Sequence, residues 1–386
     1  MLLALTAHSM VQVGMAMPSS LVGFVIRTST PIFILLFGVM ITLVHIPRAE
    51  RQGMPVLAQR SWARAIQCYL LYLANVAALW IAVPYSWRYS FLCALMLGST
   101  PYAGILQYYT IMFTAMPLTI AVLRRAPLAL CLAFAVAVHL AFPLLKAVPA
   151  PPVLMDQPIL GRLNDLLIGT GTRVEIAGPS ILHSLVLVFS GVLFGRWLVG
   201  VPRARLWPLL LLFAVMGLWS LTMTGYDVTL EGLSSMRLRN LNHPAYSFVI
   251  GGFALLAILA LVAVTRGRKV PDALLVLGRR SLFGFGFGNV IITFWPAIVT
   301  ERLEQMMSVL LLLAVVVAVI FAYDIALSRA RRGLSSGRSP ITAIYTLAAT
   351  GDRFTAAAAD VLLRWTSGRR MPSPTLPTDA PVRPPD

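Results

Sequence analysis

Charged residues are scarce in this chain, and those present are unbalanced. Only 12% of the 386 residues are charged while 58% are hydrophobic, and 31 basic residues face 14 acidic ones. With a mean hydropathy of +0.82, the chain is too apolar for a soluble globular protein and is typical of a polytopic membrane protein. The net charge of +17 does not indicate nucleic-acid binding, because the basic residues lie in short connections between apolar runs, as membrane topology requires.

Cysteine is rare, and the motifs of metal-dependent and nucleotide-binding enzymes are absent. The three cysteines, Cys68, Cys93 and Cys131, form no CxxC pair and lie in apolar surroundings, which predicts small buried hydrophobic residues and no metal site. HExxH and Walker sequences are absent, and GFGFGN at 284–289 lacks the Lys-Ser/Thr of a phosphate loop. Its glycines, with Gly191 and Gly195, predict close helix packing instead, and no bound cofactor is expected.

Carboxylates are nearly absent from the apolar runs. Asp324, close to the end of the last run, is the exception, and Arg329 could neutralise it. A proton- or sodium-coupled carrier would be expected to keep carboxylates in mid-membrane, so the sequence argues against that class.

Windows of about 20 apolar residues, the length needed to cross a bilayer, predict an all-α membrane protein. The ten predicted spans are residues 1–17, 26–45, 66–83, 102–123, 127–146, 184–201, 206–224, 245–265, 281–299 and 305–327. The stretch 84–100 contains an apolar piece too short to cross, which predicts a re-entrant or interfacial segment.

Basic residues follow every second predicted span. These residues include Arg48, Arg51, Arg60, Arg64, Arg124, Arg125, Arg196, Arg203, Arg205, Arg266, Arg268, Lys269, Arg279, Arg280, Arg329, Arg331, Arg332 and Arg338. The alternate connections hold most of the acids, so both termini are predicted to be cytoplasmic. The connections 147–183 and 225–244 are then extracytoplasmic and long enough to cover a site from outside.

The two ends of the chain lead to separate expectations. The first run lacks a basic leader and a cleavage site, so a retained first helix is expected, with a true start upstream of the given Met1. Residues 1–330 are predicted to form the membrane domain and 331–386 a cytoplasmic tail. In that tail, 340–366 has the apolar spacing of an amphipathic helix and the Pro-rich end is expected to be disordered.

Histidines are the main chemical candidates. His8 lies inside the first apolar run, where an ionisable group is costly unless it is paired or faces water, and such a position suits a general base. His139 is expected to hydrogen-bond a neighbouring helix. His183 and His243, at the outer ends of two spans, are either interfacial residues or part of the site, and His45 is cytoplasmic.

Other polar residues are predicted at a similar depth. They are Arg27, Gln107, Tyr108, Tyr109, Arg237, Arg239, Asn242 and Asn289. Several of these residues have a simpler alternative. Arg27 can extend to the membrane interface, and Tyr108 and Tyr109 can be interfacial residues. Arg237 and Arg239 can be solvated charges of a connection. The coincidence of so many polar residues near one depth favours a functional site.

Several stretches resemble a known family. They are the histidine-bearing first helix, PIFILLFG at 31–38, ILQYYTIMFTAMPL at 105–118, FSGVLFGRWL at 189–198, RNLNHPAYSF at 239–248 and LGRRSLFGFGFGN at 277–289. They are similar to membrane acyltransferases of the acyltransferase-3 superfamily, with the closest resemblance to the OpgC-like branch that succinylates periplasmic glucans. The resemblance implies about ten helices, a cytoplasmic acyl-CoA donor, and transfer of an acyl group to a hydroxyl of an outside glycan or glycolipid.

The resemblance also implies residue roles. His8 matches the family's first-helix histidine, its general base, while the family's arginine upstream of that position has no counterpart here. Asn289 stands where the late-helix pattern commonly has a histidine. An amide can hydrogen-bond but cannot usefully accept a proton.

The leading hypothesis is an O-acyltransferase of the bacterial inner membrane that moves an acetyl or succinyl group. In it, His8 deprotonates the acceptor, Arg27 and Tyr109 stabilise the oxyanion, and a second set binds the acceptor. That set comprises Gln107, Tyr108, Arg237, Arg239, Asn242, His243 and Asn289. Donor phosphates are assigned to Arg124, Arg125, Arg279 and Arg280. The alternatives are a transporter or flippase of a lipid-linked sugar, and a non-catalytic scaffold in an envelope-synthesis complex.

Overall fold

The computed structural model describes residues 1–15, 19–83, 85–98, 100–154, 157–201, 204–298 and 304–334. In these residues the regular structure is helical, apart from one isolated bridge between Leu154 and Gln157. The predicted amphipathic helix 340–366 and the Pro-rich end lie outside the described residues.

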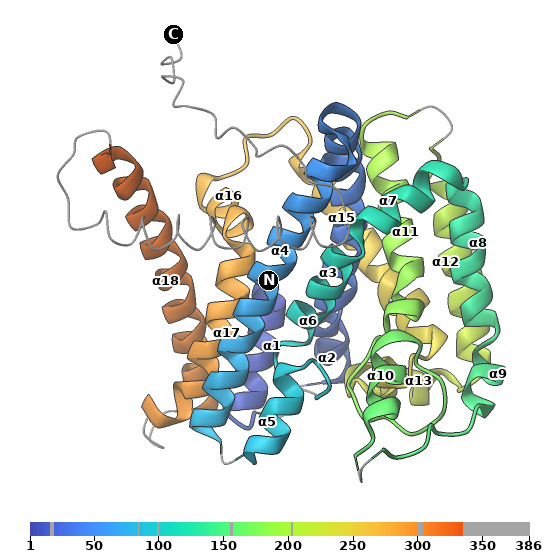
Figure 1. The fold of residues 1–386 in the computed structure, drawn as a ribbon, viewed down its shortest axis with the longest axis horizontal. Coiled ribbons are helices and arrows are strands. Elements are labelled where there is room, and N and C mark those ends of the chain that lie inside the picture. Colours follow the sequence, from blue (N-terminus) through green and yellow to red (C-terminus); the bar gives the residue numbers. More distant parts are fainter. Residues whose placement is uncertain are drawn as a thin grey trace.

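Eighteen α-helices and two π-helical turns follow one another along the described chain (Figure 1). In order they are α1 (Leu2–Gln12), α2 (Ser20–Arg27), α3 (Ser29–Met40), η1 (Ile41–His45), α4 (Ile46–Ala82), α5 (Trp87–Ala94), α6 (Gly104–Thr114), α7 (Met116–Arg125), α8 (Leu128–Leu140), α9 (Phe142–Ala147), α10 (Ile159–Leu167), α11 (Ile181–Leu198), α12 (Trp207–Thr222), α13 (Tyr226–Ser234), α14 (Arg237–Asn240), η2 (Tyr246–Ile250), α15 (Gly251–Thr265), α16 (Asp272–Arg279), α17 (Ser281–Ile298) and α18 (Gln305–Leu334).

Among the described residues, four helical segments are long and apolar enough to cross a membrane: Ser20–Ala82, Ile181–Leu198, Tyr246–Thr265 and Gln305–Arg329. The number rises to seven if each of three bent pairs, α6–α7, α12–α13 and α16–α17, forms one span. The predicted all-α membrane class is therefore confirmed, whereas ten spans and cytoplasmic termini stay predictions. The difference arises because several apolar windows are broken: α1 has only 11 residues, and α6 and α7 meet at 56°.

The longest segment contains a sharp break at Gly53. This glycine has φ 83° and ψ 164°, a conformation outside the helical region, and Pro55 follows it. Only glycine adopts such a conformation without a steric cost. In Figure 1 the ribbon reaches one end of the molecule through α3, and the long limb of α4 returns from that end. The 63 residues of Ser20–Ala82 therefore contain a reversal, which falls in the connection predicted between the spans 26–45 and 66–83.

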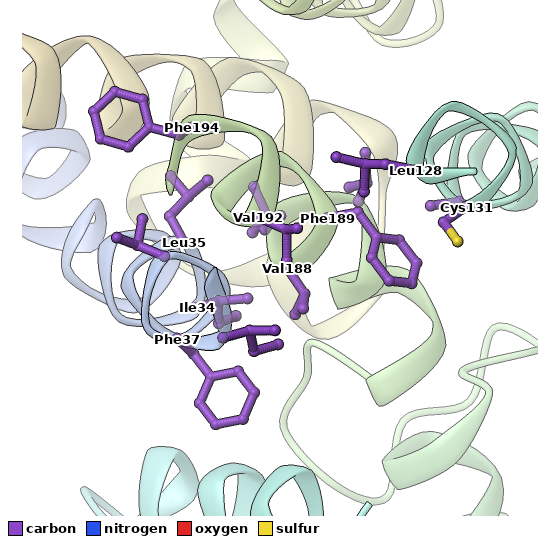
Figure 2. Close-up of a cluster of buried hydrophobic side chains, with 14 of the residues drawn as sticks. Ile34, Leu35, Phe37, Leu128, Cys131, Val188, Phe189, Val192 and Phe194 are labelled. Carbon is purple, nitrogen blue, oxygen red and sulfur yellow. The ribbon is translucent and has the colours of Figure 1, made fainter. Parts of the chain in front are cut away.

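Two glycines bring α3 and α11 into backbone contact. A Cβ atom on Gly191 would overlap the carbonyl oxygen of Leu35, and one on Gly38 would overlap the carbonyl oxygen of Val188. Small residues of this kind let membrane helices approach closely. The side chains beside this contact form the main apolar core, and Figure 2 shows α3, α11 and α8 contributing to it.

Other packing predictions are also confirmed. A Cβ on Gly284 would press on Ile320 of α18, one on Gly286 on Leu71 of α4, and one on Gly288 on Leu5 of α1. Because these three glycines have no Cβ atom, α17 can lie close to three neighbouring helices. The three cysteines are free and buried, as predicted.

The partner predicted for Asp324 was wrong. The carboxylate of Asp324 accepts a hydrogen bond from Nε of Arg280 at 2.7 Å, and both side chains are partly buried. The bend of 75° between α16 and α17 places Arg280 beside α18. Sequence proximity suggested Arg329, but this long-range bend decides the pairing.

Candidate functional site

A cavity of about 440 Å³ lies among α1, α3, α6, α17 and the connections that precede α11 and α15. Its wall is largely apolar, with a group of polar side chains converging on it, which is the usual composition of a small-molecule site. The polar and aromatic residues in the wall include His8, Arg27, Ser29, Thr30, Phe33, Thr100, Tyr102, Gln107, Tyr108, Arg239, Asn240, Tyr246 and Phe285. Five of the predicted site residues are thus brought to one cavity, and a sixth, Asn289, contacts it through His8.

The hydrogen bonds around Asn289 fix the tautomer of His8. Asn289 is fully buried, and its Nδ2 donates to the backbone carbonyl of Tyr102 at 2.9 Å. A carbonyl only accepts, so this bond orients the amide and leaves Oδ1, also only an acceptor, facing His8. Nδ1 of His8 lies 2.8 Å from that oxygen and must carry the proton. Nε2 then holds the lone pair, and among the described residues it has no hydrogen-bond partner.

Two aromatic rings hold the imidazole of His8 in place. Its centroid lies 4.8 Å from that of Tyr102 and 5.8 Å from that of Phe285. The hydroxyl of Tyr102 donates to the side-chain oxygen of Gln12 at 2.8 Å, which ties this ring back to α1. Tyr102 was missed by sequence analysis. It has a positive φ of 69°, which the sequence does not signal.

The cavity carries an excess of positive charge. Arg27 and Arg239 both line it, no Asp or Glu lines its described wall, and the two arginines lie within electrostatic range of each other and of His8. Nε of Arg27 donates to the carbonyl of Ser234 at 3.4 Å, and Arg239 donates to the side-chain oxygen of Asn240. Each guanidinium has five N–H groups, so donors remain for a ligand with oxygen acceptors. Tyr246, also in this wall, was not a predicted site residue, although it lies in the RNLNHPAYSF stretch.

Gln107 and Tyr108 each donate a hydrogen bond inside the protein. Nε2 of Gln107 donates to the carbonyl of Met96 at 2.7 Å. The hydroxyl of Ser184 donates to the carbonyl of Ile181, so Tyr108 must be the donor in its 2.9 Å bond to that hydroxyl. Gln107 therefore keeps its amide oxygen and one N–H for a ligand, and Tyr108 presents its hydroxyl oxygen and its ring.

Both long connections cover the cavity, as the sequence predicts. Residues 176–179 of the first connection and Met236, Arg239 and Asn240 of the second contribute to its wall. The carboxylate of Asp165 accepts backbone hydrogen bonds from Glu175 and Ile176 and so holds the first connection in shape. Burial raises the pKa of Asp165, and these two bonds oppose the shift.

Asn242 joins the two connections. Its side-chain oxygen accepts from the backbone N–H of Ser180 at 2.7 Å, and its own φ of 56° is left-handed, a conformation that asparagine tolerates well. It does not line the cavity. Asn242 therefore supports the wall from behind.

Three other predicted site residues also lie outside the cavity wall. The hydroxyl of Tyr109 donates to the carbonyl of Phe33 at 2.9 Å. Arg237 is exposed. His243 is buried, with Nδ1 accepting from the backbone of Ala245 and its ring against Phe142.

His139 and His183 pair inside the protein. Nε2 of His139 lies 3.0 Å from the carbonyl of His183, which links α8 to α11, and both residues are buried. The predicted helix-to-helix bond of His139 is confirmed. The interfacial alternative for His183 does not fit its burial.

The four arginines predicted to meet donor phosphates form two adjacent pairs, one at the end of α7 and one at the end of α16. Arg124 and Arg125 end α7 and are exposed, as is Arg279. Arg280 is engaged by Asp324. The ion pair makes Arg280 a poor phosphate ligand.

Comparison with known proteins adds one finding. A family model described as OpgC protein matches residues 5–92. No curated protein and no solved structure matches the chain. The matched segment holds His8 and Arg27 of the cavity wall and the Gly53 break. The N-terminal part of this chain, including its central histidine, is therefore similar to the OpgC protein family.

Proposed function

We propose that the protein is an O-acyltransferase of the bacterial inner membrane, acting on a glycan or glycolipid outside with a cytoplasmic acyl-CoA as donor. The observation that carries the proposal is the imidazole of His8: its Nδ1 proton is held by Asn289, and its Nε2 lone pair is free beside a cavity with two arginines. This is the arrangement that a general base needs. The similarity of residues 5–92 to the OpgC family supports the same activity class.

In the proposed reaction, Nε2 of His8 takes the proton of the acceptor hydroxyl while the hydroxyl oxygen attacks the carbonyl carbon of the thioester. The negative charge that develops on the carbonyl oxygen is stabilised by the guanidinium of Arg27, and Arg239 orients the substrate. When the carbon–sulfur bond breaks, the imidazolium returns the proton to the thiolate. The hydroxyl of Tyr109 donates to the carbonyl of Phe33, and Tyr109 lies outside the cavity wall. It therefore does not stabilise the oxyanion in this reaction.

A transporter or flippase of a lipid-linked sugar is the second candidate. Two cavity arginines without a carboxylate partner among the described residues could bind an anionic head group with no chemistry at His8. Acyl transfer from radiolabelled acyl-CoA by the purified protein supports the first function. Movement of substrate without covalent change supports the second.

The decisive variants are His8→Gln and His139→Ala. His8→Gln removes the base and should lower specific activity by about 10² to 10⁴, with normal insertion, because it replaces an ionisable group in the membrane domain by a neutral one. His139→Ala removes a packing bond between α8 and α11 and should lower yield while specific activity per folded protein stays near wild type. If His8→Gln retained more than about a tenth of wild-type transfer, below the range for general-base participation, His8 would not be the base.

A further inference from the structure

The break in α4 brings Arg48, Arg51, Arg60 and Arg64 near one another, and we call this group the arginine corner. On an uninterrupted helix, Arg48 and Arg64 would lie about 24 Å apart along the axis, at 1.5 Å per residue. In the structure Arg48 is within electrostatic range of Arg51, Arg60 and Arg64. The non-helical backbone at Gly53 makes this approach possible.

The four cations of this corner are not neutralised. Among the described residues no carboxylate forms an ion pair with any of them. Arg51 donates to the carbonyl of Pro47 and Arg64 to the side chain of Gln67, which leave most of their N–H groups free. Such a set of arginines attracts phosphate, because guanidinium groups bind phosphate oxygens in pairs.

His45 supplies a second and independent sign of a ligand. It lies in η1, within electrostatic range of Arg48 and Arg64, and is only 7% exposed. Its Nδ1 atom is buried without a hydrogen-bond partner among the described residues. Buried polar atoms are usually paired in folded proteins, and seven other buried side-chain atoms also lack a partner among the described residues. The position of His45 beside Arg48 and Arg64 is what connects its unpaired atom with a ligand of these arginines.

A row of aromatic rings connects this corner to His8. Centroid distances along it are 6.0 Å from His45 to Phe113, 5.1 Å to Phe37, 5.6 Å to Tyr109, 6.4 Å to Phe33, 5.6 Å to Phe285 and 5.8 Å to His8. The cavity wall includes the rings of His8, Phe33 and Phe285 but not those of His45, Phe113, Phe37 and Tyr109. The rings therefore separate the cavity from the arginine corner by an apolar layer.

We propose that Arg48, Arg60, Arg64 and His45 form a binding site for a phosphate-bearing ligand. If the proposed function holds, the ligand is the nucleotide part of the acyl-CoA donor, and its acyl arm has to cross this apolar layer to reach His8. The site differs from the one that sequence analysis assigned to Arg124, Arg125, Arg279 and Arg280. An anionic lipid head group has the same phosphate chemistry, and the test separates the two sources.

The test compares two double variants with equal charge loss. Arg60→Gln with Arg64→Gln alters the corner, whereas Arg266→Gln with Arg268→Gln alters exposed residues after α15 and serves as control. Calorimetric titration of the purified proteins with coenzyme A should give an affinity at least about tenfold weaker for the first pair, the usual effect of losing one charge-assisted hydrogen bond. The control should bind as wild type. In the transfer assay the donor KM should rise while the acceptor KM is unchanged.

A second measurement identifies the source of the phosphate. Added phosphatidylglycerol, with phosphatidylcholine as its control, should stabilise wild type and the corner variant equally if coenzyme A is the ligand. A variant that keeps coenzyme A affinity but loses this stabilisation would assign the site to lipid. Unchanged responses to both probes would overturn the site. Acyl transfer by the corner variant with an unchanged donor KM would refute the assignment of the site to the acyl-CoA donor and leave the proposed function standing. Coenzyme A binding that depends on the corner, without acyl transfer by the wild type, would support the site and refute the proposed function.

Discussion

At the residue scale, the candidate base could be read from the sequence and its orientation could not. His8 stands out because an imidazole inside an apolar run needs a partner. That partner, Asn289, lies 281 positions away and is reached only through the packing of α1 against α17. The acyltransferase family that this chain resembles commonly has a histidine at this position, and asparagine cannot take a proton in its place. The structure gives the amide a task that needs no proton transfer, which is to accept the Nδ1 hydrogen of His8.

Replacement of Asn289 tests this orientation. Asn289→Ala removes the acceptor, so His8 can adopt either tautomer, and kcat should fall by at least about tenfold to a hundredfold, the effect of removing a partner that orients a metal-bound imidazole. Asn289→Asp keeps the acceptor for Nδ1 of His8 but loses the donor to the carbonyl of Tyr102, so kcat should fall less than in Asn289→Ala without reaching wild type. The added charge stabilises the imidazolium, so the acid limb of the pH–rate profile should move to higher pH. A purely structural asparagine would give two variants with equal losses and an unmoved profile.

At the element scale, the sequence located the apolar helices and some of the breaks between them. The predicted spans 26–45 and 66–83 leave a connection around Gly53, and the predicted span 206–224 ends where α12 meets α13. The predicted span 102–123 instead runs through the 56° bend between α6 and α7, because a bend inside an apolar run changes direction without changing composition. Glycine packing was predictable, since small residues in apolar helices have few other uses. The specific contact of Gly191 with α3 required the structure.

The contact between α3 and α11 can be tested with a matched pair of glycines. Gly191→Ala would place a methyl group on the backbone of Leu35, whereas Gly278→Ala in α16 would meet no atom within 4 Å. The first should destabilise the detergent-solubilised protein by about 1–3 kcal/mol, as overpacking does, and lower its Tm. The second should leave the Tm unchanged or slightly raised, because alanine is the better helix former. Equal Tm values for the two variants would refute the close approach.

At the scale of the whole molecule, charge in the connections predicts which end faces which compartment, and the fold is compatible with that assignment. The short helices α5, α10 and α13 gather at one end in Figure 1, and the turn that follows α3 lies at the other. The acids Asp165 and Glu231 belong to the first end, through α10 and α13. The arginine corner lies at the second end, near the turn that follows α3. The cavity is covered by the connections of the first end, where the proposed acceptor would enter.

Reporter fusions provide the test of this orientation. Fusions at Glu50 and Arg268 should read as cytoplasmic, and fusions at Asp165 and Glu231 as extracytoplasmic, because basic connections stay inside. The result bears on the proposed reaction as well as on the topology. In that reaction the acyl-CoA donor binds the arginine corner from the cytoplasm, and the acceptor enters the covered cavity from outside. If the fusion at Asp165 read as cytoplasmic while that at Glu50 read as outside, the molecule would be inverted. His8 would then be reached by an acceptor from the cytoplasm, and the assignment of the arginine corner to a cytoplasmic acyl-CoA would fail with it.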